Sequence, residues 1–252
     1  MVYSSYSKEE RNAPTGENPF PAGGLPISKA FPTQTAPATE EKAQRHHVIG
    51  FYARYGKRMF DILLVFIAAP AWLPLTVLLA VGAMLDGGRP LFFQSRIGRN
   101  GKVFRIVKLR SMVVGADKKL VDYLASNPEA KAEWDEKQKL LNDPRITTYG
   151  KFIRRTSLDE LPQLWNVLRG EMSIVGPRPV TAVELKRYGS RVEFYQSMRP
   201  GITGMWQVYG RNDVSYDERI ALDVEYTRRA SLFVDIKMVL LTVPVVLRLT
   251  GR

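Results

Sequence analysis

The chain has 252 residues, a formal net charge of +12 and no cysteine. The lack of cysteine excludes a disulfide framework, a thiolate nucleophile and a cysteine metal site. The two histidines, His46 and His47, are adjacent in a polar region, which argues against a histidine metal centre or a Ser-His-Asp triad. Acid–base or nucleophilic chemistry therefore falls to Asp, Glu, Lys, Tyr or hydroxyl side chains.

The first 47 residues are predicted to form a disordered tail. Residues 1–45 contain six prolines and few large aliphatic side chains, so they cannot bury enough apolar surface to offset chain entropy. Residues 1–47 hold five basic and five acidic side chains, so the whole positive charge lies in the domain of residues 48–252. Such a charge predicts an anionic partner: phosphates, nucleic acid or an acidic membrane surface.

An apolar run of 24 residues without a charge extends from Ile62 to Leu85. As one straight helix it would measure about 36 Å, enough to cross a bilayer. Pro70 and Pro74 fall near its middle, where each removes a backbone donor, and basic residues flank both ends. Because positive residues mark the cytoplasmic side, we expect residues 57–86 to enter the membrane, bend at the prolines and return to the same face. A kinked transmembrane helix is the alternative, and a buried core helix fits the uniformly apolar run less well.

The next segment, residues 91–110, is predicted to be a β-hairpin. Two β-prone runs flank the turn signal Asn100-Gly101, and the second run alternates apolar with basic side chains. Residues 86–110 hold seven Lys or Arg and one acid, Asp86. This basic surface is compatible with contacts to lipid headgroups and with phosphate binding in a site.

The rest of the chain is predicted to be mainly helical. A loop at 199–212 is punctuated by glycines, and the GPRP stretch presents Arg178 on stiff backbone. The C-terminal apolar segment has an uncharged run of only ten residues, Met238–Leu247, too short to span a membrane. It is therefore expected to be an interfacial or core-packed helix. The other expected helices cover residues 116–141, a segment around 164–168 that Gly170 ends, and residues 216–230.

An adjacent acidic pair, Asp159 and Glu160, lies in the stretch RRTSLDELPQLWNVL. In a structural interpretation, Ser157 and Glu160 form a capping box at a helix start. Pro162 would then be the fifth helical residue, where its missing N–H costs a helix bond. If Pro162 is instead the first helical residue, the acids lie just before the helix. In both cases the helix dipole favours the ionised acids.

A functional interpretation starts from the arginines near this pair, Arg154 and Arg178. Arginine binds phosphate oxygens bidentately, and neighbouring carboxylates bind Mg²⁺ that also contacts substrate phosphates. An ionised carboxylate can also attack phosphorus. Side chains at adjacent helical positions point about 100° apart, so Asp159 and Glu160 should have different roles.

These motifs together resemble the bacterial sugar transferase family, the monotopic polyprenyl-phosphate hexose-1-phosphate transferases. The resemblance covers about residues 55–240, nearly all of the expected domain, and its blocks occur in the family's order. The matching stretches are KRMFDILL, the proline-containing apolar run, FFQSRIGRNGKVFRIVKLRSM, DPRITTYGKFIRRTSLDELPQLWNVLRGEMSIVGPRP, RPGITGMWQVYGRN and LDVEYTRRASLFVDIKM.

The resemblance implies a ping-pong reaction in which Asp159 attacks the β-phosphate of a UDP-sugar and UMP leaves. The phosphate of polyprenyl (undecaprenyl) phosphate then takes the phosphosugar from Asp159. Glu160 is expected to orient the nucleophile or assist with protons and metal, and Mg²⁺ is the expected cofactor at Asp159. Asp223 and Asp235 match family acids without an assigned role. The residues expected to bind substrate phosphates are Arg154, Arg178, Arg211 and Lys108.

The expected fold is α+β and mainly helical, with a membrane-embedded re-entrant helix-break-helix, a small β-hairpin and amphipathic interfacial helices. The resemblance implies a place on the cytoplasmic face of the bacterial inner membrane, and a role in the first membrane step of exopolysaccharide or related glycan assembly. Galactose and glucose are the expected sugars, and a homodimer is compatible with this picture. Nucleic acid is not an expected partner, because the charge lies beside the apolar run and no helix-turn-helix or zinc-finger pattern occurs.

Two other functions use the same sequence features. A membrane phosphatase or hydrolase with the same aspartate and Mg²⁺ would release free sugar phosphate without a lipid acceptor. A membrane-anchored scaffold or regulator would keep the apolar segment around a degenerate site.

Overall fold

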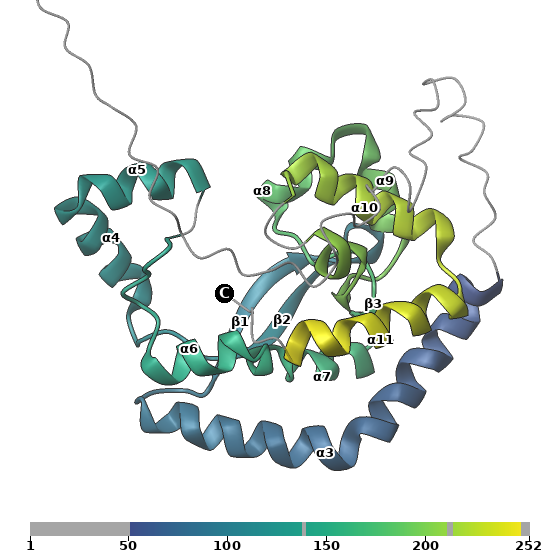
Figure 1. The fold of residues 1–252 in the computed structure, drawn as a ribbon, viewed down its shortest axis with the longest axis horizontal. Helices are drawn as coiled ribbons and strands as arrows, with labels where there is room; N and C mark the ends of the chain where they lie inside the picture. Colours follow the sequence, from purple (N-terminus) through teal and green to yellow (C-terminus); the bar gives the residue numbers. More distant parts are fainter. Residues whose placement is uncertain (1–50, 138–139, 211–213, 248–252) are drawn as a thin grey trace, which may run out of the picture. The chain divides into compact units, whose positions relative to one another are not determined.

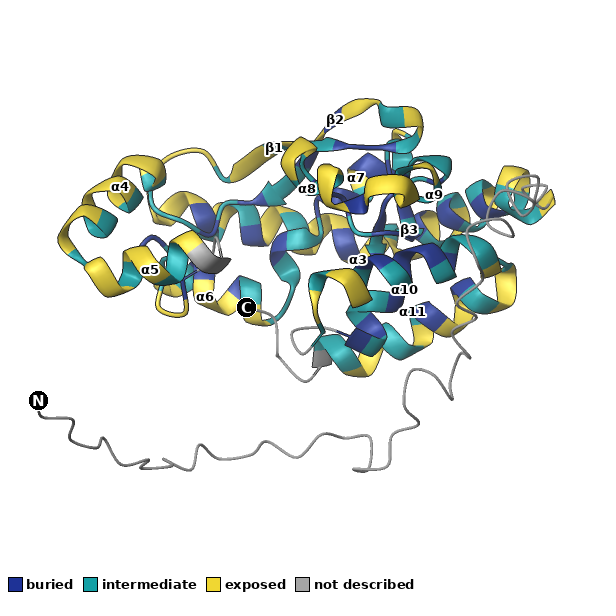
Figure 2. Cartoon of the chain, turned by 90° about the horizontal axis from the view of Figure 1, so that it is seen from above, coloured by how far each residue is buried: buried dark blue, intermediate teal, exposed yellow. Residues whose placement is uncertain are grey.

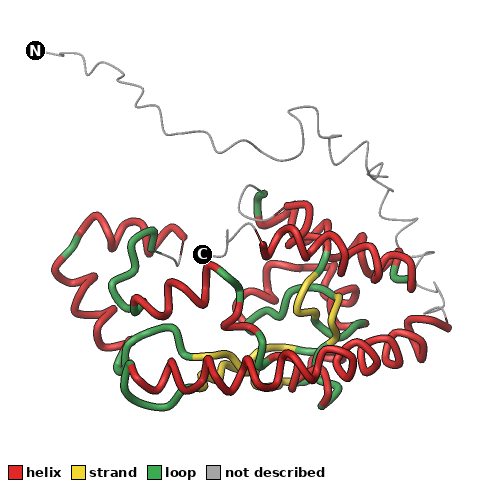
Figure 3. The backbone as a smooth tube through the Cα atoms, turned by 60° about the horizontal axis from the view of Figure 1, so that its bottom comes forward, coloured by secondary structure: helices red, strands yellow, loops and turns green. Residues whose placement is uncertain are grey.

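The computed structural model describes residues 51–137, 140–210 and 214–247, and this part of the chain is mainly helical (Figure 1). The short strands lie between the helices (Figure 3). The predicted α+β, mainly helical class is therefore confirmed. The predicted tail, residues 1–47, lies outside the described residues.

The secondary structure begins with a π-helical turn, Tyr52–Gly56, and continues into the longest helix. The elements are α3 Lys57–Leu85, β1 Leu91–Ile97, β2 Val103–Leu109, α4 Ala116–Ser126, α5 Pro128–Lys137, α6 Thr148–Arg155, α7 Gln163–Leu168, β3 Ser173–Val175, α8 Ala182–Leu185, α9 Val192–Ser197, β4 Gly201–Thr203, α10 Tyr216–Arg229 and α11 Leu232–Leu247.

Helix α3 contains both prolines of the apolar run and is bent rather than broken. Its helical conformation continues through Pro70 and Pro74, while its axis changes direction between its two ends (Figure 1). In this region Trp72 Nε1 donates to the carbonyl of Val65 at 3.3 Å, and Thr76 Oγ1 donates to the carbonyl of Trp72 at 2.7 Å. Proline is a common cause of such a bend, because it removes a helix hydrogen bond and crowds the preceding turn.

The surface of this helix is unusually apolar. Together with the preceding turn it forms a 34-residue helical stretch, and an 18-residue window within it has a mean hydropathy of 2.4 and is only 17% buried. By length and composition this stretch is sufficient to cross a membrane. A face exposing so many large apolar side chains indicates contact with lipid or with another apolar surface.

A buried ion pair fixes the start of α3 against α11. Lys57 Nζ lies 2.6 Å from Asp235 Oδ2, and the two side chains are 5% and 0% exposed. The hydroxyl groups of Tyr52 and Tyr226 also donate to this carboxylate, at 2.6 and 2.7 Å. Three donors thus surround one carboxylate, which is the geometry that compensates the cost of burying an ion pair.

The same two turns of α3 hold β3 and the end of α7. Asp61 Oδ1 accepts hydrogen bonds of 2.9 Å from Ser173 Oγ and from the backbone N–H that follows in β3. Arg58 donates to the last carbonyls of α7, at Val167 (2.5 Å) and Leu168 (2.8 Å). A cation at a helix C-terminus also stabilises the helix dipole. Helix α3 is therefore bonded directly to β3 and to the end of α7.

The core is divided between two sides of the strands. Buried residues gather around α7, β3 and α10, whereas α4 and α5 carry mostly exposed and half-buried residues (Figure 2). One cluster joins α3, β2 and α7, and a second joins the hairpin to α8, α9 and α10. The first contains Val65, Trp72, Phe104, Ile106, Val167 and Met172, and the second contains Ile97, Val180, Tyr188, Tyr195, Ile220 and Val224.

The predicted hairpin is confirmed. Strands β1 and β2 are antiparallel over their whole length, from the pair Leu91 and Leu109 to the pair Ile97 and Val103. The turn between them contains Asn100 and Gly101, both with positive φ, as expected for this residue pair.

The prediction of an irregular loop over residues 199–212 is wrong for part of its range. Strand β4 pairs in parallel with β3, and a π-helical turn, Trp206–Gly210, follows. Glycine makes this pairing feasible, because a Cβ on Gly201 would lie 2.1 Å from the backbone nitrogen of Gly176. A three-residue strand between glycines carries almost no pattern that a sequence can reveal.

The last helix, α11, packs on the core, in agreement with one of its two expected alternatives. Asp235 and Met238 are 0% and 1% exposed, whereas Phe233 and Leu240 are 76% and 64% exposed. One face thus packs on the core and the other presents apolar side chains outward, an arrangement typical of helices at a lipid surface.

We predict that Lys57→Met destabilises the protein by about 3–5 kcal/mol, because it leaves a buried carboxylate without its cation. The measurement is urea unfolding of the full chain in mild detergent. Lys131→Met is the matched control: Lys131 pairs with Asp135 at 2.7 Å, but both side chains are 59% exposed, so the expected loss is under about 1 kcal/mol. Equal losses in the two variants would contradict the assigned role of the buried pair.

Candidate active site

The acidic pair lies in a tight turn of its own. Leu158–Glu160 forms a 3₁₀ turn, and Ser157 before it has a positive φ of 57° and makes no capping hydrogen bond through its side chain. The predicted capping box is therefore wrong. The alternative is confirmed in placing the acids just before the helix, but Pro162 is the N-cap of α7 rather than its first residue, which is Gln163.

The backbone of Ser157 is unusual for its residue type. Only Asn100 and Ser157 have positive φ among the non-glycine residues that the structure describes. A non-glycine residue in this region costs about 1 kcal/mol or more and persists only where its surroundings enforce it. Such residues concentrate at functional sites, and this one directly precedes the acidic turn.

Lys108, on β2, brings a positive charge to both acids. Its Nζ lies 2.6 Å from Glu160 Oε1 and 4.0 Å from Asp159 Oδ2. Glu160 therefore has the close ion pair, while Asp159 has the more distant one. The different roles expected for two adjacent carboxylates agree with this asymmetry.

The two acids also differ in their ionisation. Burial raises the pKa of Asp159 to about 6, with Lys108 opposing the rise and Glu160 adding to it. Burial also acts to raise the pKa of Glu160, but the charges of Lys108 and Arg178 outweigh it and leave that pKa below its usual value. The helix dipole was expected to hold both acids ionised; at Asp159, which is 8% exposed, loss of solvent is the larger effect. Carboxylates whose pKa values are driven apart are typical of catalytic pairs.

Two of the predicted arginines lie near the pair. Arg154 is held through a 2.7 Å hydrogen bond from its Nε to Ser111 Oγ. Burial lowers its pKa and the charge of Asp159 raises it, so these two groups interact. Arg178 lines a small cavity beside Glu160. Arg211, the other predicted phosphate ligand, lies outside the described residues.

The cavity beside Glu160 is mainly basic and polar. Three of its side chains are cationic, and its other walls are formed by an acid, two amides and apolar or glycine residues. The lining residues are Arg96, Lys108, Arg178, Glu160, Gln163, Gln207, Ile106, Pro179, Gly201 and Ile202.

Sequence reasoning did not identify Arg96, Gln163 and Gln207 as part of the site. Gln163 is only 2% exposed, and its amide helps to lower the pKa of Glu160. A signal for Gln163 was its position three residues after Glu160. Arg96 was one of seven basic residues in the hairpin region, and nothing in the sequence distinguished it from the others.

Asp223 and Asp235, the unassigned family acids, are not among the residues that line this cavity, although Asp223 interacts with Arg178. Asp235 holds α3, as described above. Asp223 accepts a 2.7 Å hydrogen bond from the hydroxyl of Tyr188, and burial raises its pKa to about 7. Both side chains are buried in the core.

The donors available for a metal ion are the two carboxylates of the acidic turn. No group of three or more His, Cys, Asp or Glu side chains suited to a metal occurs in residues 51–137, 140–210 and 214–247. Mg²⁺ does not need such a group, because it keeps several waters and uses one or two carboxylates together with substrate phosphates. Asp159 fits this requirement, since its closest cation, Lys108, is bonded to Glu160 instead.

Comparison with known proteins links this arrangement to one family. A model described as bacterial sugar transferase matches residues 52–249. A UDP-galactose-lipid carrier transferase of Erwinia amylovora is 50% identical over 199 residues, which cover 79% of this chain and 42% of that protein. Exopolysaccharide production protein ExoY of Sinorhizobium fredii is 48% identical over 191 residues, 75% of this chain and 84% of that protein. A UDP-glucose:undecaprenyl-phosphate glucose-1-phosphate transferase of Escherichia coli is 39% identical over 196 residues, which cover 74% of this chain and 39% of that protein. The chain thus spans less than half the length of the first and third relatives.

We predict that Asp159→Asn stabilises the folded protein at neutral pH. The carboxyl ionises near 3.8 when unfolded and near 6 when folded, so between these values the folded state binds more protons and loses stability as pH rises. Asparagine does not ionise, so the variant does not lose stability in this way as the pH rises. In urea unfolding, the variant should gain about 1–3 kcal/mol over wild type at pH 7.5 and much less at pH 4. A gain independent of pH, or a loss at pH 7.5, would contradict the raised pKa.

Proposed function

This chain belongs to the bacterial sugar transferase family, and on that basis we propose that it transfers a hexose-1-phosphate from a UDP-sugar to polyprenyl phosphate and releases UMP. The observation that carries the proposal is the strained acidic turn, in which a buried Asp159 and an ion-paired Glu160 lie beside a cavity lined with cations. Relatives named for UDP-galactose and UDP-glucose support galactose or glucose as the sugar.

In the first step an oxygen of Asp159 attacks the β-phosphorus of the UDP-sugar. The bond between that phosphorus and the bridging oxygen breaks, and UMP leaves with this oxygen. A pKa of about 6 leaves Asp159 mostly ionised at neutral pH while its burial limits hydration of the charge, which favours nucleophilic attack. In the second step a phosphate oxygen of the lipid attacks the same phosphorus and frees the carboxylate.

The surrounding side chains bind and orient the phosphates. Lys108 and Arg178 bring positive charge to the cavity where the diphosphate would lie, and Arg154 adds a further positive charge near Asp159. Glu160 holds Lys108 through the 2.6 Å contact and so fixes that charge beside the nucleophile. Mg²⁺ held by Asp159 and the substrate phosphates would neutralise charge on the leaving group.

We place this site at the cytoplasmic face of the bacterial inner membrane, with α3 as a re-entrant helix. The bend in α3, its exposed apolar surface and the basic residues at both of its ends support this topology. It suits a reaction between a water-soluble nucleotide sugar and a lipid phosphate, which must meet at the bilayer surface. The name of the Sinorhizobium relative supports a role in exopolysaccharide assembly.

The covalent route predicts that the full chain releases UMP from a UDP-sugar without any lipid phosphate, in an amount close to that of the protein. Mass spectrometry should then find a hexose phosphate on the peptide with Asp159. Asp159→Asn should release no UMP and form no adduct while it stays in the membrane fraction. UMP that appears only when lipid phosphate is added would contradict the covalent intermediate, and free sugar phosphate would indicate hydrolysis.

The re-entrant topology predicts that positions on both sides of α3 are reached from one face of the membrane. Because the chain has no cysteine, Ser7→Cys and Asp117→Cys each add a single reactive thiol. In intact cells neither should react with a membrane-impermeant maleimide, and both should react in inverted membrane vesicles. Labelling of one position in each preparation would show that α3 crosses the membrane.

A further inference from the structure

Arg178 lines the cavity beside Glu160, whose close ion pair is with Lys108. It lies on the short segment between Pro177 and Pro179 that follows β3, and it has no ion pair with any residue that the structure describes. Its guanidinium carbon lies instead 5.5 Å from the ring centre of Trp206. An aromatic ring attracts a guanidinium group through its negative face, and the N–H donors of the guanidinium stay available for hydrogen bonds.

Trp206 is itself held by a second arginine. The guanidinium carbon of Arg219, on α10, lies 5.1 Å from the same ring. The ring begins the π-helical turn after β4, where glycine lets the backbones approach closely: a Cβ on Gly204 would lie 2.2 Å from the carbonyl oxygen of Gly176. The position of Trp206 is therefore set by the same strand pairing that places Arg178.

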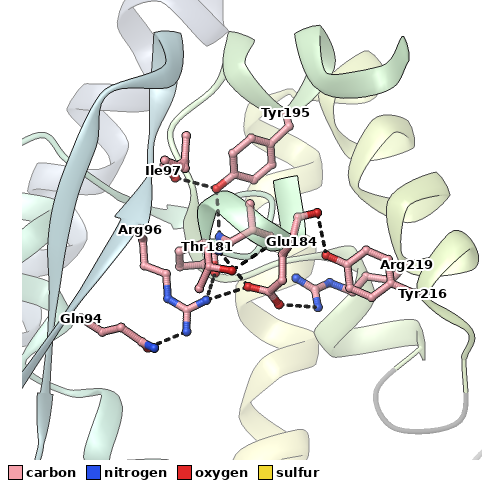
Figure 4. Close-up of polar contacts among 10 residues, drawn as sticks. Gln94, Arg96, Ile97, Thr181, Glu184, Tyr195, Tyr216 and Arg219 are labelled. Carbon is pink, nitrogen blue, oxygen red and sulfur yellow. Dashed lines mark hydrogen bonds and ion pairs between the residues drawn. The ribbon is translucent and has the colours of Figure 1, made fainter. Parts of the chain in front are cut away.

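Glu184, on α8, anchors this arrangement through two arginines (Figure 4). Its Oε2 lies 3.0 Å from Arg96 and its Oε1 lies 4.0 Å from Arg219. The carboxylate is fixed in turn by a capping box with Thr181. Arg219 also packs against Tyr216, at 5.0 Å. Of the three neighbouring arginines, two share Glu184, whereas Arg178 acts on Glu160 and Asp223 through its charge without a close ion pair.

We propose that Trp206 is a positioning residue that directs the guanidinium of Arg178 into the cavity, so that this charge is available to the diphosphate of the donor. The proposal rests on the proposed function, because it needs a diphosphate ligand. An acid in the place of Trp206 would hold Arg178 equally well but would compete with the phosphates for its N–H groups. The aromatic ring restricts the arginine and leaves its donors free.

The test measures binding of UDP-glucose and UDP-galactose to the full chain by calorimetry in an Asp159→Asn background, where no transfer occurs. Trp206→Leu should weaken binding of the preferred donor about tenfold, the scale of one cation–π contact in a partly desolvated site. Trp206→Phe keeps an aromatic face and should lose no more than about threefold. In an Arg178→Ala background, Trp206→Leu should have no further effect, because its partner is gone.

A second measurement separates charge attraction from packing. Fluorinated tryptophans introduced only at position 206 keep the shape of the ring and weaken its negative face. Affinity should fall stepwise with the number of fluorine atoms, and the unfolding midpoint should stay unchanged. In the active protein, KM for the donor should rise while kcat changes little.

The outcomes distinguish the two proposals. Equal losses from Trp206→Leu with and without Arg178, or an affinity insensitive to fluorination, would overturn the positioning role while leaving the transferase function intact. If the wild-type chain neither binds nor turns over a UDP-sugar, the proposed function fails and this inference fails with it.

Discussion

The buried ion pair between Lys57 and Asp235 is the contact on which the arrangement of the domain depends. It joins residues 178 positions apart and fixes the long apolar helix to the last helix of the domain. Within the same two turns, Arg58 and Asp61 bond to the end of α7 and to β3. Because α7 starts just after the acidic turn, these bonds tie α3 to the segment that follows the acidic pair.

Two buried carboxylates show how the number of donors decides a role. Asp235 is surrounded by an ammonium group and two tyrosine hydroxyls within 2.7 Å. All three interactions stabilise the fold. Asp159 has its closest cation at 4.0 Å, and burial raises its pKa. A carboxylate stabilised so weakly is suited to form a new bond, since little has to be broken first.

Sequence reasoning was most successful where the determining contacts are local. The turn at Asn100 and Gly101 and the end of α7 at Gly170, with a positive φ of 76°, follow from residue types that favour this backbone. The position of the acids before α7 was one of two alternatives, and Pro162 pointed to the correct one. The capping box was wrong because the left-handed backbone of Ser157 is imposed by its tertiary surroundings, which no local pattern encodes.

What the sequence did not reveal depends on distant contacts. The pairing of β3 with β4 requires glycines that are 25 residues apart, Gly176 and Gly201, to lie face to face. The burial that raises the pKa of Asp159 arises only when distant segments pack together. The same packing brings Arg96, one of seven basic residues in its region, to the cavity beside Glu160. The acidic pair itself was found because its residue types and its family context coincide.

The bond between Arg58 and the end of α7 has a mechanical consequence for a chain seated in a bilayer as proposed. A helix adjusts its tilt when the thickness of the surrounding lipid changes. Here α3 carries with it the short helix that follows the acidic turn. In the proposed topology, a change in membrane thickness would therefore move Asp159 relative to the lipid surface. The acyl-chain length of the host membrane would then influence how easily the lipid phosphate reaches Asp159.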